Sequence, residues 1–215
     1  TFLQNHDQVG NRALGDRISA TVSPDLLKVG SGLLLTSPFT PMLWMGEEWA
    51  ASTPWQFFTS HPEPDLAASV RSGRKEEFAG HGWTTDEVPD PQDPQTFRRS
   101  KLDWSEVEHD GHAEMLEWYR RLLALRRQRP GLSDPRLHAV EVAYDEQARW
   151  LVVTRGTLRV AVNLAASRQA VPLDGMPVGV LLSSVPGFVY RTGGIELEPA
   201  SIAIVELAAG PSGTA

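Results

Sequence analysis

The residues best suited to chemistry stand near the start of the chain, where an apolar stretch at residues 2–4 runs into Asn5-His6-Asp7-Gln8. A carboxylate beside an imidazole can bind sugar hydroxyls, and an ionised carboxylate stabilises the positive charge that develops on a sugar ring as its glycosidic bond breaks. In parallel α/β barrels the catalytic loops follow the carboxyl ends of buried strands, and this segment would be one of them. The alternative is that Asp7 caps a turn and His6 packs beside it.

A second acidic pair, Glu47-Glu48, follows the apolar run at residues 42–45. If that run is also a barrel strand, one of the two carboxylates could bind sugar hydroxyls or orient Arg12. Acids are equally favoured at the N-terminus of a helix, which would make the pair structural.

Aromatic side chains cluster just beyond this pair, at Trp49, Trp55, Phe57 and Phe58. Such rings could stack on the C–H faces of glucose, although packing inside a long loop competes with that role. The clustering favours at least one sugar contact, and we predict it for Phe57 and Trp49.

Several other classes of site and partner are disfavoured. The net charge of −7 argues against nucleic acid and anionic membranes as partners, and the absence of cysteine removes thiolate chemistry and fits a reducing cytoplasm. His109 and His112 lie three residues apart, but without an evident third ligand we expect them to be solvated. Asp90 and Asp93, set among prolines, are typical turn formers. We therefore predict no metal and no cofactor.

The elements that must position these residues begin with a strand–helix–strand unit. Ser23-Pro24-Asp25 has the pattern of a helix N-terminus, and the apolar stripe that follows predicts a helix between strands at residues 2–5 and 42–45. Regular periodicity fades from residue 50 to 109, which indicates a long functional loop. A strong amphipathic helix follows at 115–125, with Glu117 and Arg121 pairing at i, i+4, and it ends before Pro130.

After residue 136 the pattern changes to short Val- and Leu-rich runs separated by turn residues, which predicts an antiparallel β-sandwich. The expected strands are 137–144, 150–154, 158–164, 170–173, 178–182, 188–190 and 201–207. We accordingly expect an α/β portion at 1–135, an all-β sandwich at 136–208 and a frayed tail at 209–215.

The motifs in this order resemble the maltooligosyltrehalose trehalohydrolases, a family of the α-amylase superfamily. The resemblance is colinear from residue 1 to about residue 130. It is carried by residues 2–8 (FLQNHDQ), 9–13 (VGNRA), 40–49 (TPMLWMGEEW), 52–61 (STPWQFFTSH), 88–94 (VPDPQDP) and 99–104 (RSKLDW).

The resemblance implies a fold and a reaction. The fold would be the C-terminal portion of a (β/α)8 TIM barrel, its last two strands and helices, followed by the β-sandwich. The reaction would be hydrolysis of the α-1,4-glucosidic bond next to the terminal trehalose unit of maltooligosyltrehalose, releasing trehalose with retention of configuration. Asp7 would be the transition-state stabiliser and His6 a contact of the sugar at subsite −1, with Gln8, Arg12, Glu47, Trp49 and Phe57 as further substrate contacts.

Retention requires a nucleophile and a general acid about 5 Å apart, and the superfamily carries both on earlier strands. No motif here matches either, and the chain begins without Met on an apolar stretch. We therefore expect a piece of a longer enzyme, inactive alone and poorly stable. Maltooligosyltrehalose and related α-glucans would be its partners, together with the trehalose-forming synthase of the same pathway.

Two other functions stay open at this point. A glycogen branching enzyme or another α-glucan-active relative shares the His-Asp segment, although the proline-rich stretch with Phe57-Phe58 favours a trehalohydrolase. A non-catalytic glucan-binding module would instead use the sandwich at residues 137–208, but few aromatics lie in that span.

Overall fold

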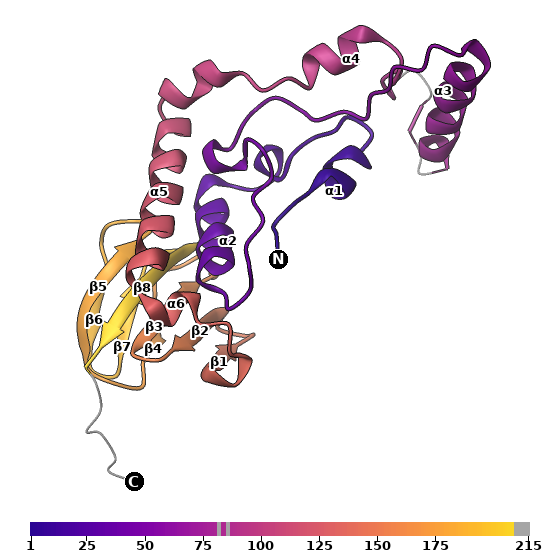
Figure 1. Cartoon of the computed structure of the whole chain (residues 1–215). Coiled ribbons are helices and arrows are strands. Elements are labelled where there is room, and N and C mark those ends of the chain that lie inside the picture. The colour runs from indigo at the N-terminus through magenta and orange to yellow at the C-terminus, as the bar shows by residue number, and fades with distance from the viewer. Residues whose placement is uncertain (81–82, 85–86, 209–215) are drawn as a thin grey trace. The chain divides into compact units, whose positions relative to one another are not determined.

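The computed structural model describes residues 1–80, 83–84 and 87–208, which form two compact units (Figure 1). The first unit comprises Thr1, Ser23–Met42 and the chain from Met115 onward, and the second comprises Phe2–Val22 and Leu43–Glu114. The tail predicted at 209–215 lies outside the described residues. The predicted division at residue 135 follows the change in sequence pattern and stays a prediction.

Two antiparallel sheets make up most of the first unit and confirm the predicted sandwich. Their strand orders are β1-β2-β3-β8-β5 and β4-β7-β6. The strands are β1 (Val140–Asp145), β2 (Trp150–Arg155), β3 (Leu158–Asn163), β4 (Gln169–Pro172), β5 (Pro177–Ser183), β6 (Val189–Arg191), β7 (Gly194–Leu197) and β8 (Ser201–Leu207). Buried Val, Leu, Ile and Ala side chains from both sheets, among them Val152, Val171 and Ile195, form the core.

Strand β7 is the one strand that the sequence pattern missed. In the sequence, Gly193-Gly194 is a pair typical of a turn. The turn is made by Gly193, with φ +77°, whereas Gly194 already pairs with Pro172. A Cβ at Gly194 would lie 2.6 Å from the Val171 carbonyl oxygen, so the glycine permits a close approach of two strands.

Helix α2 (Pro24–Thr36) packs on strands β3 and β8 and confirms the predicted helix. Ser23 caps it by accepting a hydrogen bond from the Leu26 amide at 3.4 Å. Gly32 allows the helix to lie close to the sheet, because a Cβ there would meet Ile202 Cδ1 at 2.7 Å.

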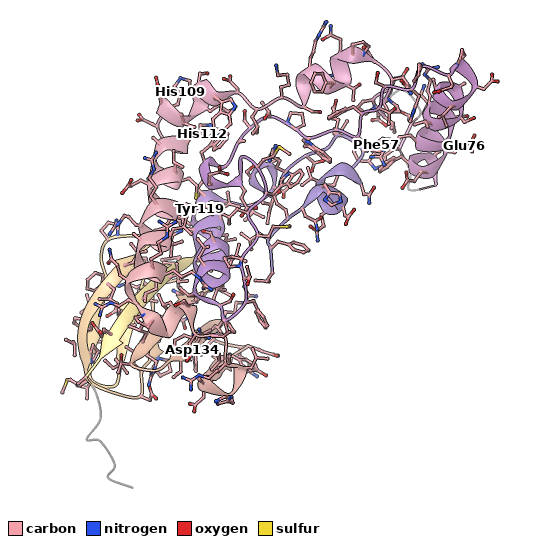
Figure 2. All side chains as sticks on the ribbon, in the orientation of Figure 1. Phe57, Glu76, His109, His112, Tyr119 and Asp134 are labelled. Atoms are coloured by element: carbon pink, nitrogen blue, oxygen red, sulfur yellow. The ribbon has the colours of Figure 1, made fainter. Side chains whose placement is uncertain are left out.

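Helix α5 (His112–Gln128) confirms the predicted amphipathic helix, and α6 (Pro130–Ser133) and the short helical turn η4 (Leu137–Ala139) connect it to β1. Trp118 Nε1 donates to Ser31 Oγ at 3.0 Å, so α5 and α2 lie side by side (Figure 1). Figure 2 shows Tyr119 on the same stretch of α5, where it is buried. The predicted pair of Glu117 with Arg121 is wrong, since Glu117 faces Arg120 at 3.9 Å, an i, i+3 spacing.

The predicted strand–helix–strand unit is present in reduced form. The Thr1 amino group donates to the Thr40 carbonyl at 2.9 Å, and the Met42 amide donates to the Thr1 carbonyl at 2.8 Å. These two bonds are the hydrogen-bond pattern of a parallel pair, with α2 as the crossover. Residues 2–5 and 42–45 are nevertheless not strands in the described chain, because a single bridge is not followed by further paired residues.

The second unit is built from short helices and connecting loops. These are α1 (His6–Gly10), η1 (Ile18–Ala20), η2 (Glu47–Trp49), α3 (Pro64–Ala79), α4 (Pro94–Arg99) and η3 (Trp104–Glu108). The expectation of an irregular loop from residue 50 to 109 is wrong, because α3 alone has 16 residues. Pro64 at the first helical position and Asp65 after it are typical of a helix N-terminus. The many other prolines of this segment hide that pattern. Among the described residues, none of the helices combines the length and apolar character needed to span a membrane.

The contact of α2 with the sheet predicts where the first unit is most sensitive to substitution. Ile202 is fully buried beneath Gly32. We expect Ile202→Ala to lower the free energy of unfolding by about 2–5 kcal/mol, because it leaves a cavity. Urea unfolding of the 215-residue chain measures this change. Val178→Ala, at an exposed position on edge strand β5, is the control and should change it by less than about 0.5 kcal/mol. Equal effects of the two substitutions would contradict the packing described here.

Candidate active site

Helix α1 presents the His6–Asp7 pair. Asn5 caps it, with Oδ1 accepting from the amides of Asp7 at 2.9 Å and Gln8 at 3.3 Å. The Gln8 side chain completes a capping box by accepting from the Asn5 amide at 2.9 Å. The predicted polar loop is therefore a helical turn, and the alternative that Asp7 caps it is wrong. Asn5 does the capping, which leaves the Asp7 carboxylate free of that task.

The His6 and Asp7 side chains are both largely exposed, at 62% and 72%, and His6 Nε2 lies 3.2 Å from Asp7 Oδ1. The imidazole ring also lies 6.1 Å from the ring of Trp44. An exposed carboxylate held by a neighbouring imidazole is able to accept hydrogen bonds from a polyhydroxylated ligand. The structure thus keeps the pair predicted from the sequence together and open to solvent.

A row of aromatic rings continues from Trp44. Trp44 meets Trp55 edge to face at 5.1 Å, Trp55 meets Phe58 at 6.2 Å, and Phe58 meets Phe97 at 5.1 Å. Phe58 and Phe97 are exposed. Rings of this kind offer apolar faces on which sugar rings can pack.

A hollow of about 190 Å³ lies beside α1 and brings two more predicted residues together. Gln8 and Arg12 both line it, as does Asp16. Arg12 is paired with Asp16 at 2.6 Å, so Asp16, and not Glu47, orients the guanidinium.

A buried charge cluster lies deeper in the second unit, around Arg17, which is 2% exposed. Its guanidinium donates to the carbonyls of Thr53 and Met45, each at 2.7 Å. Burial lowers the pKa of Arg17, although the negative charges of Glu106, Glu48 and Glu47 act in the opposite direction. The sequence carried no signal for this cluster, since a buried arginine is recognised only by its partners in space.

Glu106 is a buried acid of the cluster. Its carboxylate accepts from the indole N–H of Trp49 at 3.2 Å and from the amide and hydroxyl of Ser52. Burial by itself would raise the pKa of Glu106, but the donors from Ser52 and Trp49 outweigh it, so the pKa lies below its ordinary value.

Two predicted sugar contacts belong to this interior. Trp49 is 1% exposed and its ring packs on Trp104 at 4.9 Å, and Glu47 is 6% exposed and accepts from the Trp44 amide at 3.0 Å. Neither side chain has a face open to a ligand in the described structure. The structure therefore favours structural roles for Glu47 and Trp49 over the predicted sugar contacts.

Phe57 is placed differently, beside helix α3, and is 40% exposed (Figure 2). The guanidinium of Arg74 lies over its ring at 5.0 Å and over the ring of Phe78 at 4.4 Å. Arg74 also donates to the Gly10 carbonyl at the end of α1. Neither Arg74 nor this connection was foreseen.

The described residues contain no group of three His, Cys, Asp or Glu that could hold a metal. His109 and His112 do not form a site, because His112 Nδ1 lies 2.8 Å from the Trp49 carbonyl (Figure 2). Asp90 and Asp93 each accept a local amide hydrogen bond in a turn or cap, as expected of turn formers.

Comparison with known proteins shows which enzymes the chain resembles. A malto-oligosyltrehalose trehalohydrolase of Mycobacterium tuberculosis is 55% identical over 174 residues, which are 81% of this chain and 30% of that protein. One of Brevibacterium helvolum is 50% identical over 203 residues, 94% of this chain and 34% of that protein. Over most of its length the chain is similar to malto-oligosyltrehalose trehalohydrolases. It spans about a third of the length of these curated relatives.

Solved structures show similarity to other enzymes over nearly the whole chain. A Salmonella typhimurium protein described as a candidate α-amylase is 38% identical, with a TM-score of 0.80 over 96% of this chain and 35% of that one. A trehalulose synthase mutant, 18% identical with a TM-score of 0.58 over 97% of this chain and 43% of that one, shares the fold. Residues 135–204 also match a family model described as a domain of unknown function (DUF3459). The fold is that of the C-terminal portion of a (β/α)8 barrel followed by an antiparallel sandwich, as predicted.

The buried charge cluster yields a test that does not depend on activity. We expect Glu106→Gln to lower the free energy of unfolding of the 215-residue chain at pH 7 by about 3 kcal/mol, because Arg17 then loses a buried counter-charge. A carboxyl group with a lowered pKa stabilises the fold above the pKa of the unfolded chain, and this contribution disappears as the pH falls through the folded value. The difference between wild type and variant should therefore be largest near neutral pH and shrink in acid.

Chemical unfolding across the acid range measures this difference. Glu108→Gln, an exposed position in the same helical turn η3, is the matched control and should have little effect at any pH. A destabilisation by Glu106→Gln that does not change with pH would show that the charge of Glu106 is not the cause.

Proposed function

We propose that this chain supplies one side of the active site of a glycoside hydrolase. The enzyme cleaves the α-1,4-glucosidic bond next to the terminal trehalose unit of maltooligosyltrehalose and releases trehalose. The observation that carries the proposal is the exposed carboxylate of Asp7, held 3.2 Å from His6 on the first turn of a capped helix. The sequence similarity to trehalohydrolases over most of the chain supports the same assignment.

Asp7 would act by charge. A glycosidic bond breaks through an oxocarbenium-like transition state, and a fixed carboxylate facing the ring stabilises the charge that appears there. Retention of configuration needs a second carboxylate as nucleophile and a third group as general acid. Both would come from residues outside this chain.

The other exposed residues would bind the sugar. His6 would donate to hydroxyls of the ring facing Asp7, Gln8 and Arg12 would contact hydroxyls entering their shared hollow, and Phe57 would stack on a glucose unit. The exposure of Phe57 supports its assignment, whereas burial moves Glu47 and Trp49 out of the proposed contact set.

The remaining parts of the proposal concern the whole protein. Residues 1–135 would complete the catalytic barrel and 136–208 would form its C-terminal domain. The substrate would be made by a trehalose-forming synthase of the same pathway, and both enzymes would work in the cytoplasm.

Asp7→Asn tests the proposed chemistry in the complete polypeptide. We expect kcat for trehalose release to fall by about 10²–10³-fold with the fold intact, because the substitution removes the charge and keeps the shape. Steady-state kinetics with maltooligosyltrehalose and a thermal unfolding curve measure the two quantities. Asp110→Asn, another exposed aspartate, is the control. A variant at Asp7 that keeps near-normal kcat would remove this residue from the mechanism.

The 215-residue chain by itself should not release trehalose, since it lacks the proposed nucleophile and general acid. Incubation of the purified chain with maltooligosyltrehalose, followed by chromatography of the products, checks this expectation. Turnover at the level of a complete trehalohydrolase would place the missing carboxylates within these residues and overturn the proposed division of labour.

A further inference from the structure

Arg74 is a buried charged residue of the second unit that lies outside the cluster around Arg17. It lies on α3, is 8% exposed, and its guanidinium is sandwiched between the rings of Phe57 and Phe78. One of its nitrogens is 3.2 Å from Glu77, and another donates to the Gly10 carbonyl, 64 residues away in the sequence. Burying a guanidinium costs free energy unless it has partners, and here two rings, a carboxylate and a carbonyl serve as partners.

The Gly10 contact joins Arg74 to the residues proposed to act on the sugar. Gly10 is the last residue of α1, whose first turn carries His6 and Asp7. A helix of five residues does not persist by itself, so its geometry depends on what holds its ends. Asn5 holds the first end, and the positive charge of Arg74 sits at the carbonyl end, where a helix favours a cation.

Close packing at the same point limits other arrangements. A Cβ on Gly10 would lie 2.8 Å from the ring of Trp55, so the end of α1 is pressed against the aromatic row. The Gly10 carbonyl is therefore fixed in position, and the hydrogen bond from Arg74 acts on a helix end that has little freedom to move away.

The second contact joins Arg74 to Phe57. The guanidinium covers the Phe57 ring at 5.0 Å, while 40% of the residue stays exposed. A planar cation stacked on an aromatic ring restricts the orientation of that ring. The exposed part of Phe57 is thus presented in a set direction and not as a freely rotating side chain.

We propose that Arg74 is a positioning residue that holds the stacking ring Phe57 and the carboxylate-bearing helix α1 in one arrangement, so that binding and catalysis both depend on helix α3. This inference rests on the proposed function, because it assumes that Phe57 and Asp7 face the same substrate. Arg74 itself does not touch the sugar.

A purely structural role for Arg74 predicts something different. If the residue only stabilised the second unit, its replacement would lower the free energy of unfolding and the amount of active enzyme. The KM of the folded fraction would stay the same. A positioning role predicts a raised KM, because Phe57 loses its orientation, together with a lowered kcat, because Asp7 is displaced.

The experiment uses the complete polypeptide with maltooligosyltrehalose as substrate and compares Arg74→Met, Arg74→Lys and Phe57→Ala. We expect Arg74→Met to lower kcat/KM by about tenfold to a hundredfold, since small misplacements of catalytic groups have effects of that size. Arg74→Lys should lie between Arg74→Met and wild type, because lysine keeps the charge and loses the planar fork. Arg71→Met is the matched control, as Arg71 lies on the same helix and pairs with Asp90 at 2.6 Å at a more exposed position.

The decisive measurement is the KM and kcat of the double variant Phe57→Ala/Arg74→Met. In the Phe57→Ala background, Arg74→Met should no longer raise KM, while its effect on kcat persists, because only the α1 contact is left to lose. A KM effect of Arg74→Met that is undiminished without Phe57, or a KM unchanged in Arg74→Met itself, would overturn the proposal. If Arg74→Met does not fold, the same single and double variants are compared with Arg74→Lys in its place.

The outcome also separates this inference from the proposed function. Phe57→Ala with a normal KM would remove Phe57 from the sugar site and overturn the positioning role, while the loss of kcat in Asp7→Asn would still support the glycosidase assignment. A normal kcat in Asp7→Asn would contradict the assignment itself, whatever Arg74 does.

Discussion

The second unit depends on one buried charge. Arg17 is shielded from water and needs negative partners, which come from chain segments far apart in sequence, Glu47 and Glu48 on one side and Glu106 on the other. Because the charge must be compensated, the chain around η2 and the chain around η3 are both held to the segment that follows α1. The carbonyls of Met45 and Thr53, bound by the same guanidinium, fix the loop in between. Trp44, whose ring lies 6.1 Å from that of His6, directly precedes Met45.

The acids of this unit therefore divide into two groups. Glu47 and Glu106 are buried, hydrogen-bonded and occupied with neutralising Arg17, whereas Asp7 is exposed and is held next to an imidazole. The same contrast separates the aromatic residues. Trp49 is built into the interior through Glu106, and Phe57 is exposed under the guanidinium of Arg74. Among residues of one chemical type, the buried ones therefore stabilise the unit, and the exposed ones are accessible to a ligand.

The parts that could be predicted from the sequence are those set by local pattern. The sandwich strands, helix α2 with its Ser23 cap and helix α5 follow from alternation, periodicity and capping residues, and the His6–Asp7 pair follows from adjacency in the chain. Long-range features could not be predicted, because Arg17 and Arg74 are defined by partners that lie tens of residues away. Trp49 shows the same limit, since its type suits both a sugar platform and a core, and its burial favours the core. Helix α3 was missed because prolines are frequent in the segment around it, although the one within the helix, Pro64, stands at its first position.

A crystal structure of the complete polypeptide with a trehalose-containing ligand would show whether Asp7 faces a bound sugar. We expect a carboxylate oxygen of Asp7 within about 3 Å of a hydroxyl of the sugar ring at the cleavage site, with His6 in hydrogen-bond contact with the same ring. We also expect the rings of Trp49 and Trp104 to stay packed together away from the ligand. A ligand bound elsewhere, with the Asp7 carboxylate still facing solvent, would show that Asp7 does not stabilise the transition state.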